Sequence, residues 1–226
     1  MSVSEVNKFF DIGSLYKIAA ELDHLDSLGL PLDGRKIYEP GCGIGLLTGY
    51  FENRGCKVFS TDVLAENVVF NWQLHPWRRD RVRLHNVEDA HFPFDVRCEV
   101  VFAYGLLYHV TDPALMLQRC SENCSYFLVL SSVVNSIDDD ALHPVTQWGG
   151  EDQGLEGMVF RPARDWIVSE LEKHFEFVYT TRTQPRHEQY PTEWPTKDGF
   201  WRRAVFVASR KPLQLETLSP TLLNFQ

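Results

Sequence analysis

The chain of 226 residues is long enough for one α/β domain with an ordinary core, and it is short for two full domains. Its 44% apolar and 23% charged residues are typical of a globular protein rather than a disordered one. The formal net charge of −9, without a basic run at either end, argues against a nucleic-acid polyanion as the main partner.

Cysteine usage and the N-terminal sequence predict a cytoplasmic protein. The five cysteines are an odd number without disulfide-like spacing, so we expect reduced and mostly buried thiols. The stretch from Met1 to Glu5 has neither the basic nor the apolar region of a signal peptide. No uncharged apolar run approaches the roughly 20 residues that a membrane span requires, so no membrane contact is predicted.

The hydrophobic pattern predicts a helical N-terminal segment followed by alternating strands and helices. Apolar residues at helical spacing favour helix over the first 28 residues, with a break near Asp11 to Gly13. The elements that follow are strand 36–39, helix 46–54, strand 57–62, helix 64–73, strands 81–86 and 98–104, helix 112–122, strand 126–133, a helix opened by Arg161-Pro162 and running to about His174, and an antiparallel pair at 177–183 and 204–209. This alternation predicts an α/β fold with a doubly wound, mostly parallel, seven-stranded sheet.

The alternation fails over residues 135–160, which are rich in acidic, aromatic and glycine residues. Insertions of this length commonly serve as lids or binding loops, so we expect a lid here. We therefore treat the chain as a single domain in five segments: helical 1–32, a cofactor-binding core 33–134, the insertion 135–160, a helix and antiparallel strands 161–211, and a peripheral tail 212–226.

The most informative stretch runs from Ile37 to Gly45 and reads Ile-Tyr-Glu-Pro-Gly-Cys-Gly-Ile-Gly. Glycines let the backbone turn tightly and approach a ligand closely, because no β-carbon stands in the way. The next predicted strand ends at Asp62, and an acid in that position suits the two hydroxyls of a ribose. The pattern therefore predicts a site for a nucleoside cofactor.

Two residues indicate which nucleoside. Leu46 stands where the dinucleotide fingerprint requires its third glycine. Glu39 sits against the turn, where a carboxylate would repel a pyrophosphate but suits a positively charged ligand. S-adenosyl-L-methionine carries an ammonium and a sulfonium where NAD carries phosphates, so we predict S-adenosyl-L-methionine as the cofactor.

The segment from Glu39 to Gly45, Asp62 and residues 99–113 resemble the corresponding motifs of class I S-adenosylmethionine-dependent methyltransferases, over roughly residues 33–134. The resemblance implies a Rossmann-like methyltransferase fold. Combined with the motifs, it gives these cofactor-binding candidates: Glu39, Gly41, Cys42, Gly43, Gly45, Asp62, Val63, Asn86, Val87, Glu88 and Tyr104.

The loop after the third predicted strand leaves its register open. Asn86 falls where the family often has an Asp that bonds the adenine amino group, and an Asn carbonyl can accept the same bond. Glu88 and Asp89 remain alternatives for this contact, and a plain turn before residues 92–94 is a further alternative.

A methyl transfer to an alcohol needs a base to take the proton of the acceptor. His109, in the segment after the fourth strand, is the first candidate because histidine titrates near neutral pH. His143 and His187, in the two polar and aromatic loops, and the carboxylate of Asp152 are the others. A packing histidine is the alternative for His109. Acids 138–140 could hold Mg²⁺, but a solvated turn is favoured, so no metal site is predicted.

The loops around residues 148–154 and 184–194 are rich in aromatic, amide and charged groups that recognise sugars. This part of the chain is similar to methyltransferases encoded with surface-glycan genes, although the same aromatics could instead form a small core. We predict O-methylation of a small-molecule or glycan acceptor. A tRNA- or RNA-modifying methyltransferase is one alternative, from a faint similarity of residues 105–109 to wobble-uridine enzymes, and a non-catalytic binding subunit with this fold is another.

Overall fold

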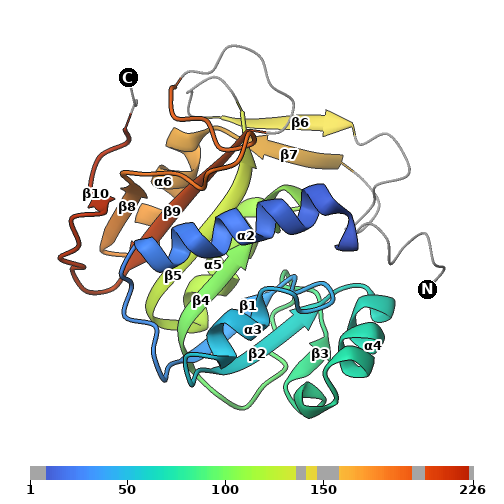
Figure 1. The fold of residues 1–226 in the computed structure, drawn as a ribbon. Coiled ribbons are helices and arrows are strands. Elements are labelled where there is room, and N and C mark those ends of the chain that lie inside the picture. The colour runs from blue at the N-terminus through green and yellow to red at the C-terminus, as the bar shows by residue number, and fades with distance from the viewer. Residues whose placement is uncertain (1–8, 136–140, 147–157, 195–201, 224–226) are drawn as a thin grey trace.

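The computed structural model describes residues 9–135, 141–146, 158–194 and 202–223, and Figure 1 shows their arrangement. An eight-stranded sheet runs through the centre in the order β10-β8-β9-β5-β4-β1-β2-β3. Its strands are β1 (Lys36–Pro40), β2 (Lys57–Asp62), β3 (Val82–Leu84), β4 (Cys98–Tyr104), β5 (Cys124–Val134), β8 (Phe177–Thr181), β9 (Arg202–Ser209) and β10 (Leu218–Ser219).

The helices and a separate hairpin complete the described residues. The helices are α2 (Ile12–Ser27), α3 (Thr48–Glu52), α4 (Ala65–Leu74), α5 (Pro113–Glu122) and α6 (Arg164–Glu172), with the 3₁₀ turns η1 (Pro76–Arg78) and η2 (Leu107–His109). The hairpin pairs β6 (Leu142–Thr146) with β7 (Met158–Pro162). None of these helices is long and apolar enough to cross a membrane.

The strands β3, β2, β1, β4 and β5 are parallel, as the alternating pattern predicts. β9 runs antiparallel to both β5 and β8 and carries the sheet to its far side. Because β9 is reversed, its first residues lie at the same edge as the carboxyl ends of β4 and β5. Residues near position 203 are therefore brought to the edge where parallel α/β sheets bind their ligands.

Side chains of β4 alternate between two hydrophobic cores, one on each face of the sheet. Val101 and Ala103 pack in the core that contains Met116 of α5 and Ile167 of α6. The intervening residues of β4 pack with Leu25 of α2 and with residues of α3 in the other core. The predicted doubly wound α/β architecture is confirmed, because a strand buried on both faces needs helices on both.

Two helices begin at residues that the sequence marks as helix starts. Asp11 accepts hydrogen bonds from the amides of Gly13 and Ser14, at 2.9 and 3.0 Å, and α2 follows it. Asp112 accepts from the amide of Leu115, and Pro113 opens α5. The predicted break near residues 11–13 is therefore the N-cap of α2.

The C-terminal region departs from the prediction in two places. Leu213 and Leu218 are buried, and residues 218–219 add an eighth strand beside β8, so a peripheral tail from 212 is wrong. Arg161 and Pro162 end β7 rather than opening a helix, and α6 begins at Arg164. Proline is compatible with the end of a strand in a two-stranded ribbon, where no neighbour requires its amide.

The described part of the insertion forms β6 and the start of β7, beyond the carboxyl end of β5 (Figure 1). Most of the predicted lid, at 136–140 and 147–157, lies outside the described residues. The lid therefore stays a prediction.

Candidate active site

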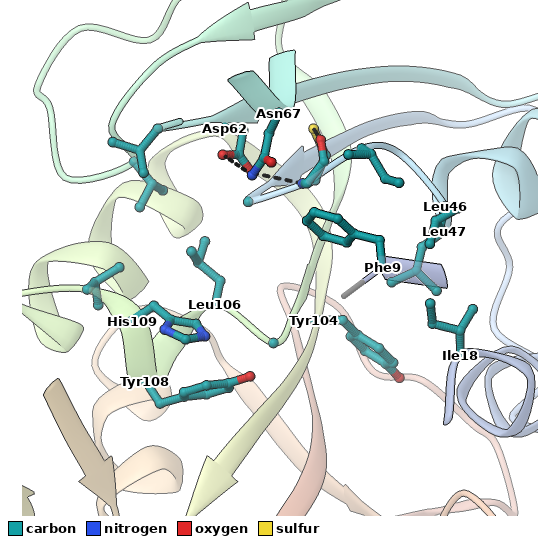
Figure 2. A pocket seen from close by; sticks show the side chains of 18 of the residues that line it. Phe9, Ile18, Leu46, Leu47, Asp62, Asn67, Tyr104, Leu106, Tyr108 and His109 are labelled. Atoms are coloured by element: carbon teal, nitrogen blue, oxygen red, sulfur yellow. Dashed lines mark hydrogen bonds between the residues drawn. The ribbon is translucent and has the colours of Figure 1, made fainter. Parts of the chain in front are cut away.

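A cavity opens at the carboxyl ends of β1, β2 and β4, where the strand order reverses between β1 and β4. This switch point is where open α/β sheets bind ligands. Its walls come from the turn after β1, the ends of β2 and β4, the loop after β3, one face of α2, and Arg203 of β9. Figure 2 shows Asp62 and Asn67 on one side of the cavity and Tyr108 and His109 on another.

The glycine turn after β1 has the backbone that its sequence predicts. Gly41 and Gly43 have φ values of 67° and 53° and line the cavity together with Cys42. A β-carbon at Gly41 would lie 2.8 Å from Leu106, which itself lines the cavity. Both the left-handed backbone and this close approach require glycine at position 41.

Gly45 and Glu39 are placed behind the turn rather than on the cavity wall. A β-carbon at Gly45 would lie 2.5 Å from Asn71 Nδ2 and 2.7 Å from Arg78 Nη1. Arg78 donates from Nη1 to the carbonyl oxygen of Gly45 at 2.9 Å. The lack of a side chain at Gly45 therefore serves close packing against Arg78 and Asn71, and its predicted cofactor contact stays a prediction.

The Glu39 carboxylate is buried, at 3% exposure. Its Oε2 accepts hydrogen bonds from Thr48 Oγ1 at 2.6 Å and Ser60 Oγ at 2.9 Å. Burial raises the pKa of Glu39 to about 7, against the lowering effect of these two hydroxyls. Glu39 thus links the end of β1 to α3 and β2, and it is not among the residues that line the cavity.

Asp62 ties the glycine turn to the end of β2. Its Oδ2 accepts from the amide of Gly43 at 2.8 Å, and its Oδ1 accepts from the Leu64 amide and Asn67 Nδ2. A carboxylate oxygen accepts more than one hydrogen bond, so Oδ2 retains acceptor capacity. Burial raises the pKa of Asp62, while these three donors act to lower it. Val63, the next residue, also lines the cavity.

The loop after β3 contributes Asn86, Val87 and Glu88 to the wall. Asn86 Oδ1 accepts from the Glu88 amide at 3.0 Å, which closes a local turn. The Glu88 carboxylate accepts from Thr111 Oγ1 and from the amide of Asp112, each at 2.7 Å. The Glu88 side chain therefore links this loop to the start of α5, and Val87 offers an apolar surface.

Tyr104 ends β4 beneath the cavity and stacks on Phe102, with ring centroids 4.2 Å apart. Its hydroxyl is buried and has no hydrogen-bond partner among the described residues. Phe9 also lines the cavity, and a β-carbon at Gly43 would lie 3.2 Å from its ring. Figure 2 shows the Phe9 ring between Asp62 and Tyr104.

Of the three predicted base candidates that the structure describes, His109 alone lines the cavity. His143 lies on β6 opposite Arg161, and its side chain is not on the cavity wall. The His187 ring lies against that of Tyr16, with centroids 5.7 Å apart and planes tilted by 47°, and it too lies off the wall. The structure therefore places His143 and His187 outside this wall, and their role as bases stays a prediction. Asp152 lies outside the described residues.

The structure brings seven polar side chains to the cavity that sequence reasoning missed. They come from α2, the end of β3, α4, the segment after β4 and β9, and they are Ser14, Lys17, Glu21, Asn67, His85, Tyr108 and Arg203. For α2 the signal was present, because polar residues at 14, 17 and 21 recur at helical spacing on an otherwise apolar segment. Arg203 had no such signal. Among the described residues, no group of three or more His, Cys, Asp or Glu could hold a metal ion.

A family model described as a methyltransferase domain matches residues 38–123, which run from β1 to α5. A ubiquinone biosynthesis O-methyltransferase of Leptothrix cholodnii is 35% identical over 95 residues, or 40% of each chain. One of Cereibacter sphaeroides is 30% identical over 108 residues, or 47% of this chain and 43% of that protein. The chain thus spans about two fifths of the length of the curated relatives it matches.

Solved structures share the fold at low identity. The N-terminal domain of EvdMO1 with SAH bound has a TM-score of 0.64 and 20% identity, over 87% of this chain and 81% of that one. An S-adenosylmethionine-dependent methyltransferase from Listeria monocytogenes has a TM-score of 0.62 and 15% identity, over 86% and 99%. With the glycine turn and Asp62 in place, residues 38–123 form a methyltransferase domain, and the chain has the fold of S-adenosylmethionine-dependent methyltransferases.

Proposed function

We propose that this protein binds S-adenosyl-L-methionine at the glycine turn and methylates an oxygen of a small-molecule acceptor. The observation that carries the proposal is the pairing of Asp62 with the Gly43 amide on the cavity wall. It presents a carboxylate oxygen beside a turn whose backbone is open to a ligand. An acid at the end of the second strand, beside a glycine turn, suits the two hydroxyls of a ribose.

The residues at this end of the cavity fit the cofactor. Asp62 would hold the ribose hydroxyls, and Val63 and Val87 would flank the adenine beside Asn86. The described wall residues from the ends of β1, β2 and β3 include no Lys or Arg, so this end has no counter-charge for a pyrophosphate. That composition favours a sulfonium nucleoside over a dinucleotide.

When bound, the cofactor supplies a methyl group already activated by its sulfonium. The chain has to hold the acceptor oxygen in line with that methyl group and take its proton. His109 stands on the wall after β4, with its ring centroid 4.2 Å from that of Tyr108. We assign the proton-accepting role to His109, because among the described residues it is the histidine that lines the cavity in the segment after β4.

Oxygen as the acceptor atom is supported by the curated relatives, which are named ubiquinone biosynthesis O-methyltransferases. This chain matches about two fifths of their length. A sugar hydroxyl is the finer proposal. In its favour, the EvdMO1 domain was also crystallised in the presence of SAH and D-fucose. That structure matches this chain with a TM-score of 0.64 and 20% identity. Against it, Tyr190 and Trp194 of the expected sugar-binding loop are 3% and 5% exposed and pack in the two cores.

An RNA substrate has less support. The compact basic cluster at 78–81 is partly internal, because Arg78 is buried and paired with Glu52 at 2.8 Å. Arg81 approaches the same carboxylate at 3.5 Å. Two of the three arginines in this cluster are thus drawn toward an acid rather than free to meet phosphates.

The test is release of S-adenosylhomocysteine from S-adenosylmethionine with a panel of phenols, alcohols, sugars and hydroxy acids. We expect turnover with an oxygen acceptor, and a loss of about 10²–10⁴ in rate for His109→Gln with the cofactor affinity retained. Cofactor binding without turnover on the whole panel would favour the non-catalytic binding subunit. Absence of cofactor binding would contradict the proposal outright.

A further inference from the structure

Arg203 reaches the cavity from the side opposite the ribose site. It stands in β9, paired with Val133 of β5, and β5 and β4 separate β9 from β1 and β2 in the sheet. Asp62, at the end of β2, therefore lies several strands away along the same edge. The guanidinium thus lines the cavity away from the proposed ribose site at Asp62.

The side chain of Arg203 is buried and held on two sides. It is 4% exposed. Nη2 donates to the Tyr108 hydroxyl at 2.6 Å, and Nε donates to Gln189 Oε1 at 2.9 Å. Nη1 has no hydrogen-bond partner among the described residues. These contacts fix the plane of the guanidinium and leave one nitrogen unused.

The unused nitrogen lies beside the open end of β4. A β-carbon placed on Gly105 would lie 3.7 Å from Arg203 Nη1 and 3.6 Å from the Tyr108 hydroxyl. Gly105 lines the cavity and has a φ of 76°, so the chain carries no side chain at this point. The space that a side chain at Gly105 would occupy therefore lies next to Arg203 Nη1.

The charges around this space favour an anion. Leaving an ionised group buried without a partner is costly, because burial strips its water and nothing replaces it. Lys17 of α2 lines the same cavity; burial and the charge of Arg203 lower the pKa of Lys17, while the acids Glu21 and Asp11 act to raise it. Glu21, the acid of α2 on this wall, already accepts the Tyr190 hydroxyl at 2.6 Å on Oε1.

We propose that Arg203, assisted by Lys17, forms a subsite for a carboxylate of the methyl acceptor, which makes the acceptor a hydroxy acid. This inference rests on the proposed methyltransferase function and narrows its substrate class. Arg203 and Tyr108 would hold the carboxylate, and the acceptor hydroxyl would lie toward His109 and the methyl group. The other source of a carboxylate is the methionine part of the cofactor, and the experiment separates the two.

Calorimetry on the protein saturated with S-adenosylhomocysteine compares matched probes with and without a carboxylate. The pairs are glucuronate with glucose, and 3-hydroxybenzoate with its methyl ester. We expect at least one acid to bind about tenfold or more tightly than its neutral partner. Arg203→Gln should abolish this preference and Arg203→Lys should keep part of it. The neighbouring Arg202→Gln, whose residue bonds the Glu188 carbonyl off the cavity, should keep all of it.

Equal binding of acid and neutral probes to the wild-type protein, or no binding of any acid, would overturn the subsite without needing a variant to fold. The cofactor source is tested with S-adenosylhomocysteine and 5′-methylthioadenosine, which lacks the amino-acid carboxylate. If Arg203→Gln weakens the first ligand and spares the second, the guanidinium holds the cofactor and the inference is wrong. Failure of wild-type protein to bind S-adenosylhomocysteine at all would instead refute the proposed function.

Discussion

Asp62 is the residue on which cofactor binding depends most directly. Its carboxylate meets Gly43, Leu64 and Asn67, and it lines the cavity. Replacing it by Asn keeps the shape and removes the charge, so affinity for S-adenosylhomocysteine should fall by about 1–3 kcal/mol, the scale of a charge-assisted hydrogen bond. Titration calorimetry measures the change on protein whose folding is checked by circular dichroism.

The matched control for this change is Glu66→Gln. Glu66 is exposed on α4, four residues from Asp62, and does not line the cavity. Its neutralisation removes a nearby negative charge without removing a ligand. If Asp62→Asn binds no more weakly than this control, Asp62 is not the ribose ligand.

Glu39 makes the stability of the ligand-free protein depend on pH. Its folded-state pKa of about 7 lies above the ordinary value of 4.5, because the carboxyl is buried. Between these values the folded state holds a proton that the unfolded state releases, so the free energy of unfolding falls as pH rises. Glu39→Gln removes this penalty, and the variant should gain roughly 3 kcal/mol on the wild type between pH 4.5 and pH 8.

Urea unfolding at several pH values checks this prediction, with the variant compared with wild type at each pH so that other titrating groups cancel. The exposed Glu66→Gln again serves as the control for loss of a carboxylate. Parallel stability profiles for Glu39→Gln and wild type would mean that Glu39 is ionised at little cost in the folded protein.

Local sequence predicted the residues whose roles depend on the backbone beside them. Gly41, Gly43 and Asp62 form one turn, and their spacing was sufficient to predict it. Arg203 was missed because it reaches the cavity from a distant element, and nothing in the adjoining residues marks it. Lys17 was missed although the polar residues at 14, 17 and 21 recur at helical spacing. His143 and His187 lie off the cavity wall, and the sequence could not place them, since loop composition does not tell which way a loop folds.

At the level of elements, α2 is the helix that completes the cavity. It contributes Ser14, Lys17, Ile18 and Glu21 to the wall, all on one helical face. Three contacts hold its C-terminal half: His24 Nε2 lies 2.9 Å from the Thr183 carbonyl, Tyr190 donates to Glu21, and Thr217 donates to the Leu28 carbonyl just beyond it. The N-terminal half depends more on what the cavity contains.

We therefore expect S-adenosylhomocysteine to slow amide hydrogen exchange in the first two turns of α2 and in the glycine turn. α6 lines none of the cavity and is the internal control, because its exchange should change only as far as global stability does. Mass spectrometry of exchanged peptides resolves the two helices. Equal change in α2 and α6, or none in either, would show that α2 does not close on the ligand.

For the whole molecule, the alternation of strands and helices predicted the sheet, because strands that are buried on both faces and the helices that cover them each have a recognisable hydrophobic pattern. This pattern is lost where an element is short or paired at an edge. β10 has two residues, and the β6–β7 pairing joins one segment inside the insertion to another at its end, so neither produced a readable pattern. Burial of Leu213 and Leu218 shows that the C-terminal region nevertheless belongs to the core.

On this interpretation, the cavity at the β1–β4 switch point binds S-adenosylmethionine and does not bind a dinucleotide. Titration calorimetry of the wild-type chain with S-adenosylmethionine, and separately with NADH, tests it most directly. The account predicts one molecule of S-adenosylmethionine bound per chain and no binding of NADH, since no Lys or Arg lines the described nucleoside end. No heat with S-adenosylmethionine at millimolar concentration, or saturable binding of NADH in its place, would contradict it.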